Sequence, residues 1–514
     1  LGTCNSSGLF SQLTGNFVYM NEVSTVAAAY ALGGFAVDST HIGSGPSALS
    51  GVGLVNAFNA SPNMYNINAG AAQGALSTTP SGNGTVPADE INSIADMLAS
   101  CINSTGSTST NCSTLLTNAT SGGTSPVTPT EVSTAAINIV HNPAANVGNL
   151  YGLFTNSSPF QPTITSVPKD YSVIIGYNLG SSNQPADLAI DANGNIWLTN
   201  NNSGAPSLTQ VSPVGTVLSG NGYTNVQMTA PTGLAIDQSG KAWVCDEGDI
   251  LFSFIASGGT ATSSAYTGAD LSGDPQAVAI DSNGSIWVTQ NSNQAVNFLS
   301  DGTESFATSG GGLKTQSGTS NVAVAPGNNV FIANYKASGT TDTVSSFSSS
   351  GTPRSSNTAF GNSLAQRSGI GIAIDANNQF WITNSGSNSV TIGSTTSGTA
   401  SPIAVAPGSS SAGLSNPQGI AFDGKSSAWI ANNSGTVSVL SNTGAAVTGS
   451  SGYGGTVAAT MPGISPIAVD GAGNVWTVSS SSGILFEYVG AATPVVTPLV
   501  DNLIAPYSTP ASKP

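Results

Sequence analysis

The sequence predicts a mainly β protein, with a seven-bladed β-propeller preceded by a small α-helical domain. A strand-turn-strand unit recurs seven times after residue 180, successive copies begin 44 to 50 residues apart, and every tryptophan occupies one position of the unit. Repeats of about 45 residues that contain several short strands are typical of propeller blades. A solenoid of stacked β-units is the alternative, but its coils are usually shorter and its ends need distinct caps.

Each repeat begins with an apolar strand that has alanine in its interior and, in six of seven copies, ends on aspartate. The alanines are Ala189, Ala235, Ala279, Ala323, Ala373, Ala421 and Ala468, and the aspartates are Asp191, Asp237, Asp281, Asp375, Asp423 and Asp470. The next strand carries an aromatic residue: Trp197, Trp243, Trp287, Phe331, Trp381, Trp429 and Trp476. We expect the small alanine to let the inner strands converge on the axis. The aromatic ring should fill the wider space between blades, burying about 150–250 Å².

The repeated aspartates have two interpretations. They could form a ring of carboxylates that binds calcium, or each could accept backbone N–H bonds within its own tight turn. One residue per blade is spread around the ring, so the copies lie too far apart to share an ion. The turn interpretation is therefore favoured.

A second polar series stands three residues after the aromatic position: Asn200, Asp246, Gln290, Asn334, Asn384, Asn432 and Ser479. Turn capping is the expected role. If these side chains instead face one mouth of the propeller, they would form an amide-rich surface that binds glycans or peptides.

The densest acidic cluster is Asp246, Glu247 and Asp249. It could hold a Ca²⁺ ion, although adjacent carboxylates on a loop are more often simply solvated. The sequence predicts no other cofactor.

Residues 1–155 are expected to form the helical domain and residues 156–170 a linker. Between Ile91 and Ile102 the apolar residues follow helical spacing, and Asp89 and Glu90 stand where a helix dipole favours acids. Further helices are predicted at about 21–33, 48–59, 112–119 and 129–141, and from Asn142-Pro143 to about residue 154.

The propeller is expected to span residues 171–493. Tyr171–Tyr177 alternates like a strand and should complete the last blade from the other end of the chain, which closes the ring. Residues 494–514 form a proline-rich tail, within which Pro494–Val500 could add an outer strand to this molecule or to a neighbour.

Cys101 and Cys112 flank a loop rich in Ser, Thr and Asn. A disulfide between them would contribute about 3 kcal/mol, and two buried thiols are the alternative. Cys4 and Cys245 could pair with each other, pair between chains, or stay free.

The chain is poor in ions, with 6% charged residues, eight Lys plus Arg, and a net charge of −16. This composition excludes a basic face for nucleic acid or anionic lipid. No apolar run reaches the roughly 18–20 residues that a membrane span needs. A surface of hydroxyls and amides, together with the expected disulfide, predicts a secreted or cell-surface protein from which upstream sequence was removed before Leu1.

Both histidines, His41 and His141, precede the propeller, and no HExxH, P-loop or GxSxG motif occurs. Imidazole-based metal binding or catalysis is therefore not available within the propeller. We expect His141 to end its helix, where a positive charge would favour the dipole.

The segment Pro231–Asp237, followed by Ala242-Trp243-Val244, resembles the NHL-repeat and virginiamycin-B-lyase-like propellers. The stretches Asn21–Leu32 and Glu90–Cys101 resemble the helical part that precedes such a propeller in secreted proteins of acidobacteria. The resemblance implies architecture and secretion. Lyase activity in that family is attributed to His and Glu side chains near the propeller mouth with Mg²⁺, and this propeller has no histidine to take that role.

Three functions are compatible with the sequence. The first is a non-enzymatic extracellular structural or adhesive protein, such as the repeating subunit of a surface layer or filament, whose partners are further copies or cell-surface components. The second is a glycan- or peptide-binding propeller module. The third is a divalent-ion-dependent lyase or hydrolase that uses Asp246 or Glu247.

Overall fold

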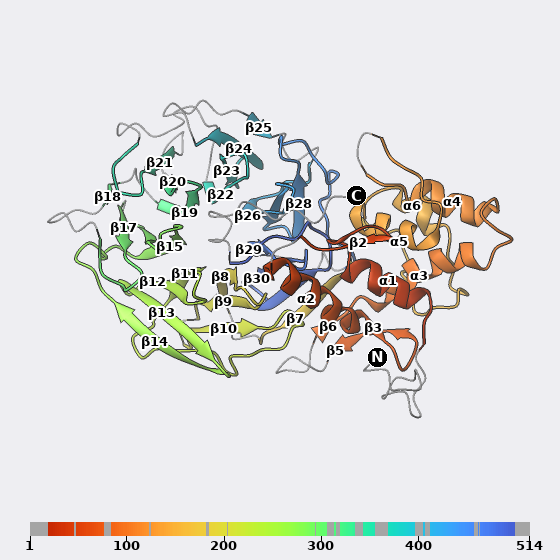
Figure 1. The fold of residues 1–514 in the computed structure, drawn as a ribbon, viewed down its shortest axis with the longest axis horizontal. Coiled ribbons are helices and arrows are strands. Elements are labelled where there is room, and N and C mark those ends of the chain that lie inside the picture. Colours follow the sequence, from red (N-terminus) through yellow and green to blue (C-terminus); the bar gives the residue numbers. More distant parts are fainter. Residues whose placement is uncertain are drawn as a thin grey trace.

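The computed structural model describes residues 19–498 except 46–47, 77–83, 123–124, 181–183, 203, 293, 306–312, 315–318, 335–342, 355–368, 396–403, 407–411, 457–460 and 462. Figure 1 shows helices gathered on one side and sheets arranged around a common centre on the other. The prediction of a mainly β chain is confirmed.

Seven sheets follow one another along the chain, and each begins with a repeat strand. The first strands are β8 (Pro185–Ile190), β11 (Pro231–Ile236), β15 (Pro275–Ile280), β19 (Thr319–Ala325), β22 (Gly369–Ile374), β26 (Pro417–Phe422) and β29 (Ile464–Val469). The second strands are β9 (Ile196–Asn200), β12 (Ala242–Asp246), β16 (Ile286–Gln290), β20 (Asn329–Asn334), β23 (Gln379–Asn384), β27 (Ala428–Asn432) and β30 (Val475–Ser479).

The outer strands are more variable. Third strands are β10 (Ser207–Val211), β13 (Ile250–Ser257), β17 (Gln294–Phe298), β21 (Thr343–Phe347), β24 (Ser389–Ser394), β28 (Thr436–Leu440) and β31 (Ile484–Tyr488). Fourth strands are β14 (Thr260–Tyr266), β18 (Leu313–Lys314) and β25 (Ala404–Ala406). In the first six of these sheets, neighbouring strands pair antiparallel in chain order, as in a meander.

The first strands lie side by side around the centre. Each contacts the first strand of the next sheet, and β29 of the last sheet contacts β8 of the first. This radial arrangement of sheets is that of a β-propeller.

The last sheet is built from distant parts of the chain. β7 (Ile174–Asn178) pairs antiparallel with β31, with Ile174 opposite Tyr488, which is the pairing expected for the segment Tyr171–Tyr177. Two short strands that the sequence did not predict, β6 (Gly84–Thr85) and β5 (Ala75–Leu76), then continue this sheet.

Six helices occur in the described part of the N-terminal third: α1 (Glu22–Ala31), α2 (Ala48–Met64), α3 (Ala88–Ile102), α4 (Thr110–Asn118), α5 (Val132–His141) and α6 (Val147–Tyr151). Short strands pair beside them, β1 (Ala36–Asp38) with β2 (His41–Ile42) and β3 (Tyr65–Asn66) with β4 (Ala71–Ala72). Helix α6 is shorter than predicted. Asn146 adopts a left-handed φ of 51°, and the Pro143 carbonyl accepts the Tyr171 N–H instead of a helical one.

The predicted disulfide joins Cys101 and Cys112, and Cys245 is a buried free thiol. Cys4 lies outside the described residues. In the described part of the chain, no helix is both long and apolar enough to cross a membrane.

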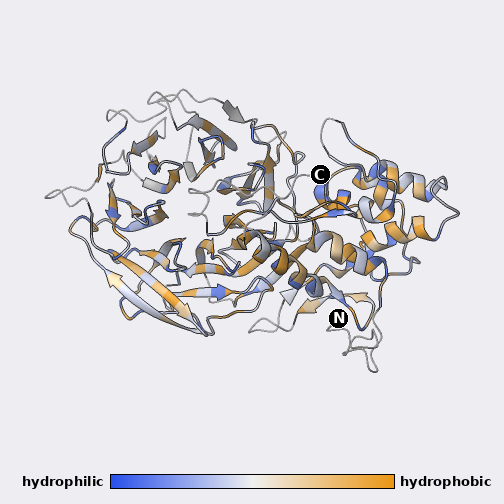
Figure 2. Cartoon of the chain, viewed as in Figure 1, coloured by the Kyte–Doolittle hydropathy of each residue, from blue (hydrophilic) through white to orange (hydrophobic). Residues whose placement is uncertain are grey.

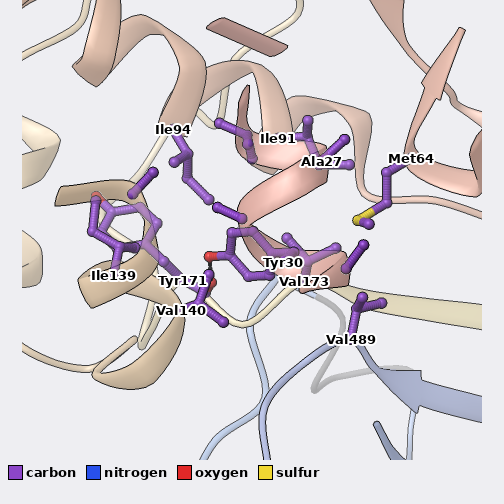
Figure 3. Close-up of a cluster of buried hydrophobic side chains, with 14 of the residues drawn as sticks. Ala27, Tyr30, Met64, Ile91, Ile94, Ile139, Val140, Tyr171, Val173 and Val489 are labelled. Atoms are coloured by element: carbon purple, nitrogen blue, oxygen red, sulfur yellow. Dashed lines mark hydrogen bonds between the residues drawn. The ribbon is translucent and has the colours of Figure 1, made fainter. Parts of the chain in front are cut away.

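The helices and the last sheet share one hydrophobic core. Figure 3 shows Tyr30, Ile94 and Val140 from the helices beside Tyr171 and Val489. The Tyr30 hydroxyl donates to the Tyr171 carbonyl within this cluster. The helices and the last sheet are therefore packed together through this cluster.

Candidate functional site

A cavity of about 270 Å³ lies where the first strands meet. Each first strand contributes its repeat alanine and the residue on either side, as with Leu188, Ala189 and Ile190, so almost all residues of the wall are apolar. The polar residues in the lining are Asp375 and Thr497. Such a chamber suits an apolar group rather than an ion.

The alanine and the aromatic residue of each repeat act together. Ala189 lies directly opposite Trp197 in the pairing of β8 with β9. Trp197 is buried against Leu234 and Ile236 of the next sheet, so the indole fills the space between sheets. The small alanine leaves the centre open, which explains why every copy of this residue lines the cavity.

The C-terminal segment Thr493–Pro498 reaches the cavity at its end. Thr497 and Pro498 belong to the lining. The Thr497 hydroxyl donates to the Asp191 carbonyl over 2.8 Å. Upstream, the Thr493 N–H donates to the Asp423 carboxylate over 3.4 Å.

This placement corrects the expectation for Pro494–Val500. The described residues of that segment are buried and form no strand. The Val495 N–H donates to the Asp470 carbonyl, so the segment bonds to the turns of its own sheets rather than to a sheet edge. Leu499 and Val500 lie outside the described residues.

Helix α2 contacts two of the turns that follow the first strands. The Asn56 side chain donates to the Asn193 carbonyl over 2.8 Å. Gly53 meets Gly471 so closely that a Cβ at position 53 would stand 1.8 Å from the Gly471 carbonyl oxygen. The helix and the C-terminal segment thus both contact the turns that follow the first strands.

Each repeat aspartate organises its own turn, as its sequence context suggested. Asp281 accepts the N–H groups of Asn283 and Ser285, both over 2.9 Å, through Oδ1. Its Oδ2 accepts the indole N–H of Trp287 over 3.2 Å. The same indole-to-carboxylate bond occurs in all six Asp-containing copies, over 2.8–3.2 Å.

The indole bond was missed in the sequence, although a signal for it was present. The single copy without aspartate, at Ala325, is also the single copy without tryptophan, at Phe331. Phenylalanine has no ring N–H to donate, so the two residues of the pair are lost together.

The second polar series does not form an exposed amide-rich face. All of its members are buried. Asn200 accepts the Gln184 N–H over 2.7 Å, and Asn432 accepts the Ser415 N–H over 3.0 Å. Asn200 and Asn432 thus bond the backbone that enters their first strands. Asn334 and Asn384 instead donate to neighbouring hydroxyls, to Ser345 over 2.9 Å and to Thr391 over 3.0 Å. Because the series is buried, it offers no exposed surface to a glycan or peptide.

The three carboxylates of the acidic cluster have different surroundings. The Asp246 carboxylate accepts the N–H groups of Thr229, Ala230 and Gly248 and the Thr229 hydroxyl. Asp249 accepts the Asp274 N–H, and Glu247 lies in an exposed turn. No group of three or more His, Cys, Asp or Glu suited to a metal occurs among the described residues.

The histidines lie in the helical region. His41 bonds to Asp38, with 2.7 Å between Nδ1 and Oδ1. His141 ends α5 as predicted, and its Nε2 donates to the Gly33 carbonyl over 2.8 Å.

No protein-family model matches the sequence, and no curated protein matches it. Among solved structures, the chain is similar to virginiamycin B lyase from Staphylococcus aureus, with 14% identity, 61% of this chain and 98% of that chain covered, and a TM-score of 0.49. It is also similar to YCF48 bound to D1 peptide, with 14% identity, coverage of 62% and 96%, and a TM-score of 0.45. The WD40 β-propeller domain of Doa1 has 11% identity, coverage of 60% and 94%, and a TM-score of 0.46.

A tyrosine beside the third strand of several sheets is a further feature that the sequence analysis missed. Tyr177 stacks on Trp476, with 5.8 Å between ring centroids, and Tyr223 packs on Trp197 at a similar distance of 5.6 Å. The Tyr223 hydroxyl donates to Gln210 over 2.9 Å, whereas the Tyr177 hydroxyl donates to the Glu487 carboxyl over 2.6 Å.

Glu487 is fully buried beside Trp476. Desolvation, with the Asp470 charge as a smaller cause, raises the pKa of Glu487 to about 8. This carboxyl therefore holds its proton at neutral pH.

Proposed function

We propose that this chain is a non-enzymatic extracellular binding protein, in which the seven sheets are the blades of a closed propeller and the axial cavity receives an apolar side chain of a polypeptide partner. The observation that carries the proposal is the cavity itself. Almost all residues of its wall are apolar, and the protein's own Thr497 and Pro498 are part of the lining. A volume of about 270 Å³ suits one large side chain rather than an extended ligand.

The functional groups around the cavity support binding rather than catalysis. Asp375, the carboxylate in the lining, is occupied by the Asn377 and Gln379 N–H groups and the Trp381 indole. Desolvation also raises the pKa of Asp375, which weakens it as an anion. Apolar walls supply affinity through the hydrophobic effect without any reacting group.

An extracellular location is supported by the disulfide between Cys101 and Cys112 and by the low charge of the chain. A structural or adhesive role is the second candidate. It is favoured by the outer strand β14, whose sequence contains no charged residue. A glycan-binding role for the Asn series loses its support because those side chains are buried.

The test is selection of peptides from a random heptapeptide library on the purified full chain, followed by calorimetric titration of the enriched peptides. We expect them to share one large apolar residue. Ala279→Leu, which fills the cavity, should weaken binding at least about tenfold, which corresponds to about 1.4 kcal/mol. The matched control Ala205→Leu changes an exposed loop and should leave binding intact. Equal binding to both variants, or a library that yields no binder, would overturn the proposal.

A further inference from the structure

The hairpin β13–β14 forms the rim of the second sheet. The two strands pair without a bulge from Leu251 opposite Tyr266 to Ser257 opposite Thr260. β12 pairs only with Ile250–Phe254, so the end of the hairpin reaches beyond the rest of the sheet. Figure 1 shows β14 as the outermost strand, with one neighbour, β13.

One face of the hairpin is anchored. Ala261 packs against the cluster that contains Trp197, and the Asn225 side chain donates to the Ser263 hydroxyl over 3.1 Å. The outer edge of β14 has no backbone hydrogen-bond partner within the part of the chain that the structure describes. The strand is therefore held in place while one row of its N–H and C=O groups is unpaired.

The edge also lacks the usual protection against another strand. Natural edge strands are short or carry lysine, proline, an inward charge or a bulge. β14 is seven residues long, reads Thr-Ala-Thr-Ser-Ser-Ala-Tyr, and has none of these features. Figure 2 colours it close to white, between hydrophilic and hydrophobic. The other fourth strands, β18 and β25, have two and three residues.

We propose that β14 pairs antiparallel with β14 of a second copy of this chain, across a two-fold axis at Ser263. This register places Thr262 opposite Ser264 and Ala261 opposite Ala265, so side chains of similar size face each other at the centre of the pair, and Thr260 faces Tyr266 at its ends. In this register, an odd-numbered residue always faces an odd-numbered residue. The anchored faces of the two strands, which carry Ala261 and Ser263, therefore lie on the same side of the joined sheet.

A second copy fits this edge better than a partner chosen by charge. The chain carries a net charge of −16, so most surfaces of two copies repel each other. The hairpin Ile250–Tyr266 contains no Asp, Glu, Lys or Arg, so two copies meet here without charge repulsion. The proposal is independent of what the axial cavity binds.

The pairing should be weak. A strand pair of this length buries less than the roughly 1,200–2,000 Å² of a stable specific interface. We expect a dissociation constant of about 10 μM to 1 mM.

The first test is sedimentation velocity of the full chain from about 1 μM to 1 mM. The expected result is a monomer–dimer equilibrium. Ser264→Lys, which places a charge on the edge, should shift the dissociation constant upward at least about tenfold. Ser272→Lys makes the same charge change at an exposed serine outside the hairpin, and it should leave the dissociation constant unchanged. A monomer at every concentration, or a dimer unaffected by Ser264→Lys, would overturn the proposal.

The second test is oxidation of the double variant Thr262→Cys, Ser264→Cys in a Cys4→Ser background. The proposed register predicts a covalent dimer with disulfides between position 262 of one copy and position 264 of the other. Peptide mapping would identify them. The two single variants are the controls and should cross-link much less, because neither places its new thiol opposite itself. Cross-linking that is no greater in the double variant would contradict the register.

Discussion

Glu90 of α3 and Asp170, which precedes β7, are held by adjacent residues of one loop. The Gly454 and Gly455 N–H groups donate to Asp170 over 2.9 and 3.1 Å, and the Thr456 hydroxyl donates to Glu90 over 3.1 Å. Desolvation raises the pKa of both carboxyls, and the nearby Asp170 charge raises the pKa of Glu90 further. The contact between helices and sheets is therefore strongest when this pair carries a proton.

The first prediction is that the protein loses stability as the pH rises. Glu90, Asp170 and Glu487 have higher pKa values in the folded state than in the unfolded state, where carboxyls titrate at about pH 4. The folded state therefore binds more protons than the unfolded state between these pKa values. The stability of the folded state is highest below about pH 4 and falls as the pH rises to the folded pKa, which is about 8 for Glu487. Melting curves at pH 5, 7 and 9 should show a falling Tm. A Tm that rises across this range would contradict the prediction.

The second prediction concerns Glu487→Gln. The first sheet already carries glutamine at this place, where Gln210 accepts the Tyr223 hydroxyl. The substitution should preserve the bond from Tyr177 and remove the cost of ionising a buried carboxyl. We expect a gain of about 1–3 kcal/mol at pH 9 and little change at pH 5, measured by urea unfolding. The exposed Glu247→Gln is the control and should show no pH-dependent gain.

The third prediction tests the bond between Asp281 and Trp287. Trp287→Phe leaves the buried Oδ2 of Asp281 without its indole donor and should cost about 1–3 kcal/mol. Asp281→Ala should also destabilise, because two turn N–H groups lose their acceptor. The double variant recreates the natural pair Ala325 and Phe331. Its loss in free energy of unfolding should therefore be about 1 kcal/mol smaller than the sum of the losses of the two single variants. Strict additivity would show that the two residues do not act together.

The fourth prediction compares two glycines of α2. Gly53→Ala places a methyl group against the Gly471 backbone and should destabilise the protein by about 2 kcal/mol or more. A Cβ at Gly51 meets no atom within 4 Å. Gly51→Ala should therefore stabilise the helix by up to about 1 kcal/mol. Similar effects of both changes on Tm would argue against the contact between α2 and the Asp470 turn.

The fifth prediction concerns calcium. The Asp246 carboxylate already accepts four hydrogen bonds, so binding an ion would require breaking some of them. We expect the Tm of the EDTA-treated protein to change by less than about 1 °C when millimolar Ca²⁺ is added. A larger rise that Asp249→Asn abolishes would restore the calcium interpretation.

The repeat itself could be predicted from the sequence, because Ala189, Asp191 and Trp197 recur at fixed spacing and each has a local physical role. The strand β7 was also predictable, since its alternation is visible and the last sheet needs a further strand. The roles of residues that bond to distant parts of the chain could not be predicted in this way. Nothing in the sequence near Thr497 indicates that it bonds to Asp191, and nothing near Glu90 indicates Thr456.

The polar series shows a different limit. Asn200 and Asn432 occupy a repeated position, but periodicity does not distinguish a side chain that faces solvent from one that turns inward to bond the backbone. The cavity was likewise not foreseen, because the alanines were assigned only to the approach of neighbouring blades. Their position opposite the indoles, as with Ala189 and Trp197, became evident only from strand register.

The pairing of β7 with β31 has a consequence for how the chain folds. Ile174 and Tyr488 meet only after the intervening sheets have been synthesised, so this pairing has a very long loop to close. Until then β7 and the helices packed on it expose apolar surface, in a state prone to aggregate. We expect this sheet to form last. In a chain that ends before Ile484, β7 would have no β31 to pair with, so we expect the ring of sheets to stay open rather than to close with one blade fewer.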